Sequence, residues 1–237
     1  MDTDEMLEIS QEFAALGAEL RGEGDNLAAL QRMVDLAVKH IAGCSWASIT
    51  VVNGGLGHSL VVSDPIAAQA DTLQYSLGEG PCLSAAENDS NYLMFDVAGE
   101  TRWPKYARAL AEQTPVRSVL SFQLVAQESA ALNLFADMPA AFDDASMNAA
   151  AIFAAHTTNL VALHEAQDTA DNLETALASS RRIGAAIGVL MAHHKVTEDA
   201  AFGMLRTTSQ HLHRKLRDVA VEVVETGTLP ATPAIKA

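Results

Sequence analysis

The sequence predicts an α+β fold, with an antiparallel sheet flanked by helices, a long connecting helix and a C-terminal three-helix bundle. Three observations predict it. Short segments with β-strand alternation cluster before residue 136 and do not alternate regularly with helices, which favours an antiparallel sheet over βαβ units. Residues 143–194 contain no proline and no strong helix break. Two more amphipathic segments follow, between residues 197 and 227.

The composition is typical of a globular protein with two folding units. The 237 residues leave room for one domain of ordinary size and a smaller module. A hydrophobic fraction of 49% and a mean hydropathy of +0.10 are sufficient for a packed core. No apolar run approaches the roughly 18 residues of a membrane span, and the N-terminal MDTDEMLEIS is acidic, unlike a secretion signal. The two cysteines, Cys44 and Cys82, lack metal-ligand spacing. We therefore expect a cytoplasmic protein that does not enter the membrane.

Charge is distributed unevenly along the chain. The net charge of −15 is unfavourable for nucleic acid, because phosphate binding depends on Lys and Arg. However, residues 173–237 hold eight Lys and Arg against six Asp and Glu, a net charge of +2, together with four of the eight histidines. Anion-binding capacity is therefore concentrated at the C-terminal end.

The first 140 residues contain the expected sheet and its helices. Helical spacing of apolar residues predicts helices over 4–21 and 26–43, with a turn at 22–25. A hairpin is predicted over 46–62, turning at Asn53-Gly54-Gly55. Further short elements are helices over 65–73 and 106–113 and strands over 91–95, 118–120, 122–126 and 131–135.

A two-stranded coiled coil would explain the length of the helix predicted over 143–194. A 4,3 spacing marks one line of positions, which we call the seam. The seam consists of Ile152, His156, Asn159, Leu163, Ala166, Ala170, Leu173, Leu177, Ser180 and Gly184. We expect the seam to form a homodimer. The alternative is a helix that folds back on its own domain.

The C-terminal segments predict a small bundle. Thr197 is a good N-cap for a second helix that ends near Ser209-Gln210. A third helix, stopped by Gly227 and Pro230, carries an apolar stripe: Leu212, Leu216, Val219, Ala220, Val223 and Val224. The end of the long helix contributes Ile183, Ile187, Leu190 and Met191 to the same core.

The run from Ala176 to Val224 resembles an ANTAR domain. The matching motifs are Ile183-Gly184-x-Ala186-x-Gly188-Val189-Leu190-Met191, Ala201-Phe202-x-x-Leu205-Arg206 and Arg214-Lys215-Leu216-Arg217-Asp218-Val219-Ala220. The resemblance implies a three-helix RNA-binding module that recognises paired hexanucleotide stem-loops in nascent transcripts and prevents terminator formation. Two positions depart from the common pattern: Ile187 replaces a frequent Lys, and His213 replaces a frequent Asn.

Polar and small residues outside the apolar stripes are the candidate RNA-binding residues, since Arg and Lys hold phosphates and planar side chains stack on bases. They are Arg181, Arg182, Ala186, Gly188, Arg206, Ser209, Gln210, His213, Arg214, Lys215 and Arg217. Two alternatives remain open: a solvated helix face for the basic run, and tight helix packing for the small residues. Zinc binding by His193-His194 and His211-x-His213 is disfavoured, because no cysteine lies nearby.

A second resemblance covers about residues 25–165. The segments Tyr75-Ser76-Leu77-Gly78-Glu79-Gly80-Pro81-Cys82, Arg102-Trp103-Pro104 and Val116-Arg117-Ser118-Val119-Leu120-Ser121-Phe122 resemble the GAF domains that precede ANTAR modules in actinobacterial proteins. The resemblance implies a small-molecule sensor, with pocket candidates Gly78, Gly80, Cys82 and Trp103. The ligand is unknown and no cofactor is expected; a haem ligand at His58 or His156 is disfavoured. A dimerisation scaffold without a ligand is the alternative.

Together these features predict a GAF-ANTAR antitermination regulator rather than an enzyme, because no catalytic constellation is present. The expected divisions are a GAF-like domain over 1–165, a connecting coiled-coil helix over 144–180, an ANTAR bundle over 173–230 and a tail over 231–237. The expected partners are tandem RNA stem-loops and a second copy of the chain. Two rival functions are a DNA-binding regulator, disfavoured by the acidic residues of the third helix, and a redox sensor or enzyme centred on Cys82.

Overall fold

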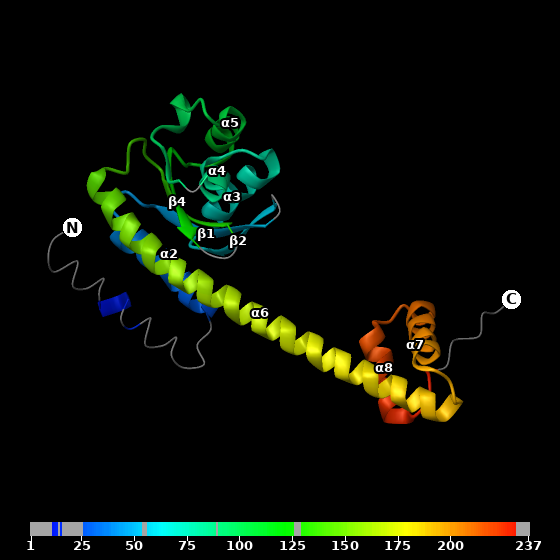
Figure 1. The fold of residues 1–237 in the computed structure, drawn as a ribbon. Helices are drawn as coiled ribbons and strands as arrows, with labels where there is room; N and C mark the ends of the chain where they lie inside the picture. The colour runs from blue at the N-terminus through cyan, green and yellow to red at the C-terminus, as the bar shows by residue number, and fades with distance from the viewer. Residues whose placement is uncertain are drawn as a thin grey trace. The chain divides into compact units, whose positions relative to one another are not determined.

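A computed structural model (Figure 1) describes residues 11–13, 15, 26–53, 56–88, 90–125 and 129–230. The chain divides into two compact units, Met1–Ala166 and Gln167–Ala237. The fold is α+β, as predicted: an antiparallel sheet with flanking helices in the first unit, and helices only in the described part of the second.

The first unit is built on a five-stranded antiparallel sheet with the order β2-β1-β5-β4-β3. Its strands are β1 (Trp46–Asn53), β2 (Leu56–Val62), β3 (Tyr92–Met94), β4 (Ser118–Val125) and β5 (Ser129–Ala136). In the register of the sheet, Ile49 lies between Val61 on β2 and Leu132 on β5. The predicted hairpin at 46–62 is confirmed for its two strands.

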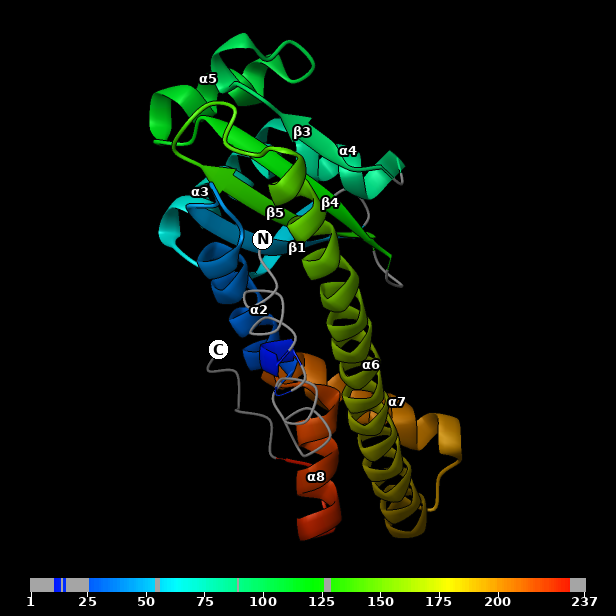
Figure 2. The same ribbon diagram turned by 90° about the vertical axis from the view of Figure 1, so that its left-hand side faces the viewer.

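Helices cover both faces of this sheet (Figures 1 and 2). On one face lie α2 (Asn26–His40) and the first part of α6 (Asp144–His194), with a core that includes Leu30, Leu132 and Phe153. On the other face lie α3 (Pro65–Leu77), α4 (Pro81–Asn88) and α5 (Pro104–Gln113), with a core that includes Tyr106 and Phe135. A 3-10 turn, η1 (Val97–Gly99), precedes α5. Because both faces are covered, polar side chains on the strands are buried as well as apolar ones.

Three expectations for this unit need correction. The segments 118–120 and 122–126 are one strand, β4, because Ser121 pairs in register with both Tyr92 and Asn133. Helix α3 extends to Leu77, where Gly78 ends it with φ +66°. Helix α4 was not predicted, because its first residue, Pro81, follows two glycines and reads as a turn. Proline is also a favourable first residue of a helix. Of the helix predicted over 4–21, only residues 11–13 and 15 are described, and they are helical.

The long helix is confirmed as α6, with 51 residues. Its first part packs on the sheet through Ala150, Phe153, Ala154, Thr157 and Val161, all buried. All ten seam positions are exposed. The helix therefore packs on its own domain with one face and leaves the seam exposed, although the ring of Phe13 contacts the seam residue His156.

The second unit contains the end of α6 together with α7 (Glu198–Leu212) and α8 (Leu216–Thr226). Its core is fully buried and consists of Ala186, Leu190, Ala201, Leu205, Val219, Ala220 and Val223. Thr197 caps α7 as predicted, accepting a hydrogen bond of 3.4 Å from the Ala200 N–H. No helix in the described part of the chain is long and apolar enough to cross a membrane.

The predicted third helix begins too early. Residue Leu212 is the last residue of α7, and His213 then adopts φ +51°, a left-handed conformation that ends the helix. Helix α8 starts only at Leu216. Val224 is 44% exposed, so it does not belong to the apolar stripe.

Candidate nucleic-acid interface

The turn between α7 and α8 carries most of the basic run. The Ser209 hydroxyl donates a hydrogen bond of 2.6 Å to the Arg214 carbonyl, and the Arg214 N–H donates one of 3.1 Å to the Ser209 carbonyl. Ser209, a predicted RNA-binding residue, therefore holds this turn in shape. Because residues 213–215 are not helical, the alternative of a solvated helix face does not describe them.

The three cations of this run differ in their surroundings. Arg214 Nη1 lies 2.6 Å from Glu222 Oε2 on α8, whereas Arg217 Nε lies 3.7 Å from Asp218 Oδ1. Lys215 is exposed at the N-cap position of α8 and makes no ion pair with the residues that the structure describes. Of the three cations, Lys215 can therefore bind an added anion without breaking an ion pair, and Arg217 would give up only its long contact with Asp218.

The other predicted residues come from α6 and α7, and most of them are exposed. Arg181, Arg182 and Gly188 are exposed on α6, and Arg206, Gln210 and His213 are exposed on or directly after α7. The prediction is wrong for Ala186, which is 0% exposed in the core of the bundle, so its side chain packs instead of contacting RNA. At Gly184 and Gly188 an added Cβ would meet no atom within 4 Å, so tight packing inside this chain does not explain these glycines.

A groove between α6 and α8, which we call the α6–α8 groove, brings two of the predicted arginines together. Its volume is about 350 Å³. It is lined by Thr175, Ala178, Ser179, Arg182, Arg217, Asp218 and Val221. Sequence reasoning found the arginines and missed the other five residues. The available signal was the spacing of residues 175, 178, 179 and 182, which share one face of a helix.

The structure does not support a zinc site at the C-terminal histidines. The rings of His193 and His194 are 4.8 Å apart and meet edge to face. The described residues contain no group of three or more His, Cys, Asp or Glu side chains placed to hold a metal ion.

In the first unit, the surroundings of the four pocket candidates can be described one by one. Gly78 caps α3, and a Cβ at Gly80 would collide with the side chain of Gln74. The buried Trp103 donates a hydrogen bond of 3.0 Å from Nε1 to Ser84 Oγ. Cys82 is fully buried, and burial raises the pKa of its thiol to about 12. A redox or nucleophilic function needs an acidic, exposed thiol, so the structure disfavours that rival.

Instead, a buried polar group that the sequence did not reveal lies at the centre of this unit. Asp71 on α3 is 0% exposed and accepts hydrogen bonds from Ser59 Oγ (2.6 Å), Asn133 Nδ2 (3.2 Å) and Thr50 Oγ1 (3.4 Å). The Tyr75 hydroxyl lies 2.8 Å from Thr50 Oγ1. We call these five residues the Asp71 cluster. Burial raises the pKa of the Asp71 carboxyl to about 6 despite these hydrogen bonds.

Two buried polar atoms next to this region have no partner in the described structure: Gln74 Nε2 and the Tyr106 hydroxyl. Burial, followed by the charge of Asp71, raises the pKa of Tyr106 well above its usual range. Hydrogen-bonding groups without partners are unusual in a protein interior. Both atoms lie in the interior of the first unit, on α3 and α5.

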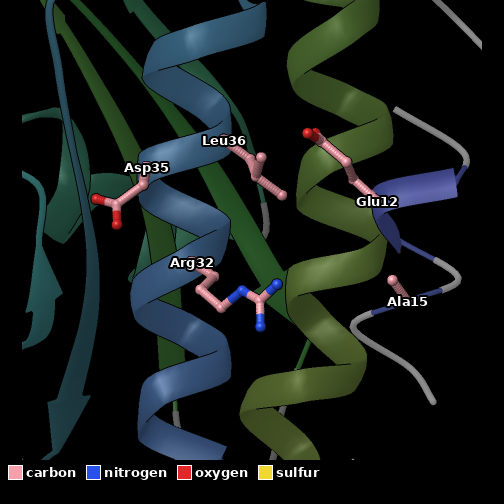
Figure 3. Close-up of a pocket in the computed structure, with 5 residues that line it drawn as sticks. All are labelled: Glu12, Ala15, Arg32, Asp35 and Leu36. Carbon is pink, nitrogen blue, oxygen red and sulfur yellow. The ribbon is translucent and has the colours of Figure 1, made fainter. Parts of the chain in front are cut away.

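A second pocket of about 170 Å³ is lined by Glu12 and Ala15 and by three residues of α2, Arg32, Asp35 and Leu36 (Figure 3). Glu12 accepts hydrogen bonds from Lys39 Nζ (3.0 Å) and His40 Nε2 (2.9 Å). Next to it, the Phe13 ring lies 4.3 Å from the ring of His156. His156 is thus in contact with an aromatic side chain, and His58 is exposed on β2, so neither favours haem.

Comparison with known proteins agrees with both resemblances. The ANTAR domain family matches residues 171–224. No curated protein matches the chain. The GAF domain of a phosphoenolpyruvate-protein phosphotransferase from Acinetobacter is 13% identical, covers 70% of this chain and 97% of its own, and has a TM-score of 0.52.

Two further solved structures are similar at lower TM-scores. A GAF domain region of a Geobacter sulfurreducens putative membrane protein is 14% identical over 59% of this chain and 94% of its own, with a TM-score of 0.47. Free methionine-R-sulfoxide reductase from Neisseria meningitidis is 16% identical over 65% of this chain and 89% of its own, with a TM-score of 0.49. The class is that of a two-domain protein whose first unit has a GAF sensor-like fold, as in the Acinetobacter domain. In particular, the chain joins a domain of the GAF fold to an ANTAR domain, whose family consists of RNA-binding antiterminators.

Proposed function

We propose that this chain is a cytoplasmic transcription antitermination regulator, whose ANTAR bundle binds paired hexaloop stem-loops in nascent RNA and prevents terminator formation. The observation that carries the proposal is a group of exposed cations within the matched residues 171–224, among them Arg181, Arg182, Arg206, Lys215 and Arg217. Cations on three helical segments can hold the phosphates of a folded loop, and guanidinium planes can stack on its bases.

Stem-loop RNA fits this surface better than duplex DNA. A helix that reads a DNA groove presents base contacts and cations along its exposed face. Helix α8 instead carries Asp218 and Glu225 at exposed positions, and Glu222 is paired with Arg214. These carboxylates would repel the phosphates that flank a groove.

We further propose that the chain is a homodimer that pairs through the seam of α6. Leu163, Leu173 and Leu177 are 45%, 68% and 50% exposed, which is unusual for leucine unless a partner covers it. The 4,3 spacing of the seam positions, all of them exposed, fits pairing with a second helix. Two copies would supply two bundles for two stem-loops.

The GAF-like domain is proposed as the sensor or dimerisation unit. A sensor function is supported by the Asp71 cluster and by the partnerless atoms of Gln74 and Tyr106, which offer hydrogen bonds to a small polar molecule. This domain is proposed to regulate rather than to catalyse, because Cys82 is buried with a raised pKa.

Fluorescence anisotropy of the full chain tests the RNA function. The probes are tandem hairpins with six-nucleotide loops, a single such hairpin and a DNA duplex of the same length, each across a salt series. We expect the tandem hairpins to bind most tightly and the duplex least. Tighter binding of the DNA duplex at equal salt would contradict the proposal and favour the DNA-binding regulator.

A further inference from the structure

The α6–α8 groove has a composition that phosphate binding alone does not explain. Two cations, Arg182 on α6 and Arg217 on α8, line it together with a carboxylate, Asp218. Arg182 makes no ion pair with any described residue. The nearest cation to Asp218 is Arg217 at 3.7 Å, longer than a hydrogen bond, so the carboxylate oxygens are open to a donor.

A carboxylate weakens a site that has to hold only phosphate, since like charges repel. A ligand that complements both the positive and the negative side chains of the groove has an anionic group for the arginines and N–H donors for Asp218. A nucleotide with an unpaired base has both. Hydroxyls of Thr175 and Ser179 and small apolar side chains of Ala178 and Val221 complete the lining. At about 350 Å³, the groove lies within the roughly 300–1,000 Å³ range of small-ligand sites.

We propose that the α6–α8 groove receives one unpaired loop base of the RNA, and that Asp218 selects guanine by accepting hydrogen bonds from its Watson–Crick edge. Guanine presents two neighbouring donors there, N1–H and N2–H, whereas the other RNA bases present no such pair. A carboxylate accepts both at once, and charge-assisted hydrogen bonds of this kind are the stronger ones. This inference rests on the proposed RNA-binding function and adds a base-reading residue to it.

Dimerisation leaves this groove accessible. The lining positions 175 and 182 follow the seam positions 173 and 180 by two residues. Two residues correspond to about 200° around an α-helix. The groove therefore opens on the side of α6 opposite to the seam, and each copy in a dimer keeps its own base site.

The test is selection from a pool of hairpin RNAs with a randomised six-nucleotide loop, bound to the full chain and sequenced. Four proteins are compared: wild type, Asp218→Asn, Ala178→Leu and the control Glu225→Gln. The control removes an exposed carboxylate of the same helix outside the groove. Thermal melting of each variant establishes that it is folded.

We expect wild type and Glu225→Gln to enrich guanine at one loop position and Asp218→Asn to lose that enrichment. Ala178→Leu, which fills the groove without changing charge, should lose it as well. On a selected hairpin, inosine in place of that guanine should weaken wild-type binding about tenfold, as expected for loss of one charge-assisted hydrogen bond, and leave Asp218→Asn unchanged.

The outcomes separate this inference from the proposed function. If wild type enriches no hairpin, RNA binding itself is wrong. If wild type enriches hairpins and folded Asp218→Asn keeps the same guanine preference, the chain binds RNA but Asp218 does not read a base. If Asp218→Asn binds every loop more tightly by the same factor, the groove holds phosphate only, which also overturns the inference.

Discussion

Arg214 Nη1 lies 2.6 Å from Glu222 Oε2, so the first cation of the Arg-Lys-x-Arg run is already an ion-pair partner of α8 before RNA binds. Its neighbour Lys215 has no such partner among the described residues. The two cations should therefore respond differently to substitution.

We expect Lys215→Ala to weaken stem-loop binding and flatten its salt dependence without changing the melting temperature, because a lost phosphate contact releases fewer counterions. Arg214→Ala should in addition lower the unfolding free energy by about 0.2–1 kcal/mol, the usual value of an exposed ion pair. The double variant should lose roughly 1–3 kcal/mol of binding free energy. Anisotropy across salt and thermal melting measure these effects. Unchanged affinity in the double variant would place the RNA surface elsewhere on the bundle.

Asp71 should make the stability of the first unit depend on pH. Its pKa is raised from 3.8 to about 6, so between these values the folded state binds more protons than the unfolded state. The free energy of unfolding should therefore fall as pH rises from about 4 to 6, by about 3 kcal/mol, and stay level above pH 6. Asp71→Asn should remove this slope, and the exposed control Asp35→Asn should keep it.

Both tryptophans, Trp46 and Trp103, lie in the first unit, so tryptophan fluorescence during urea unfolding reports on that unit alone. An identical slope in wild type and Asp71→Asn would show that Asp71 is not the titrating group.

The small bundle should be sensitive to truncation of its core. Leu205 is 0% exposed, whereas Phe202 on the same helix is 39% exposed. Leu205→Ala should cost about 2–5 kcal/mol. Because a bundle of this size has little stability in reserve, the variant should lose helical circular dichroism and RNA binding together while tryptophan fluorescence remains native. Phe202→Ala should melt nearly like wild type. Equal destabilisation by both variants would contradict this packing.

The seam predicts the oligomeric state. Replacing Leu173 and Leu177 with Lys should convert a dimer to a monomer in light scattering, since charged side chains at paired core positions repel. Asn172→Lys, which adds a charge at an exposed position outside the seam, should leave the mass unchanged. A monomeric wild type, with and without hairpin RNA, would remove the coiled coil from the proposal.

Periodicity predicted most of the elements, because the helices and strands here carry clear spacing in their apolar residues. Periodicity failed at residues whose type is compatible with more than one backbone conformation. Pro81 starts α4 although the preceding glycines indicate a turn, and His213 ends α7 in a left-handed conformation that is rare outside glycine. The domain boundaries and the actinobacterial grouping stay predictions.

The sites depended on information that sequence patterns lack. Ser48 and Thr50 alternate with apolar residues on β1, which predicts that they face solvent. They are 0% exposed, because helices cover both faces of the sheet. Arg182 and Arg217 belong to separate helices, and only their packing places both in the α6–α8 groove. The sequence could thus predict candidate binding residues, but it could not predict which of them lie next to each other in the folded chain.

The open helical glycines of α6 have a consequence for backbone dynamics. A glycine inside a helix costs about 1 kcal/mol relative to alanine, and Gly184 and Gly188 stand one turn apart with empty space beside each. Residues 150–161, by contrast, are held by side chains buried against the sheet. Amide hydrogens around 184–188 should consequently exchange with solvent deuterium sooner than those of residues 150–161 in the isolated chain. A partner helix or a nucleic acid that covers the glycines would slow this exchange, so the exchange rate of the amides of residues 184–188 reports whether this part of α6 is covered.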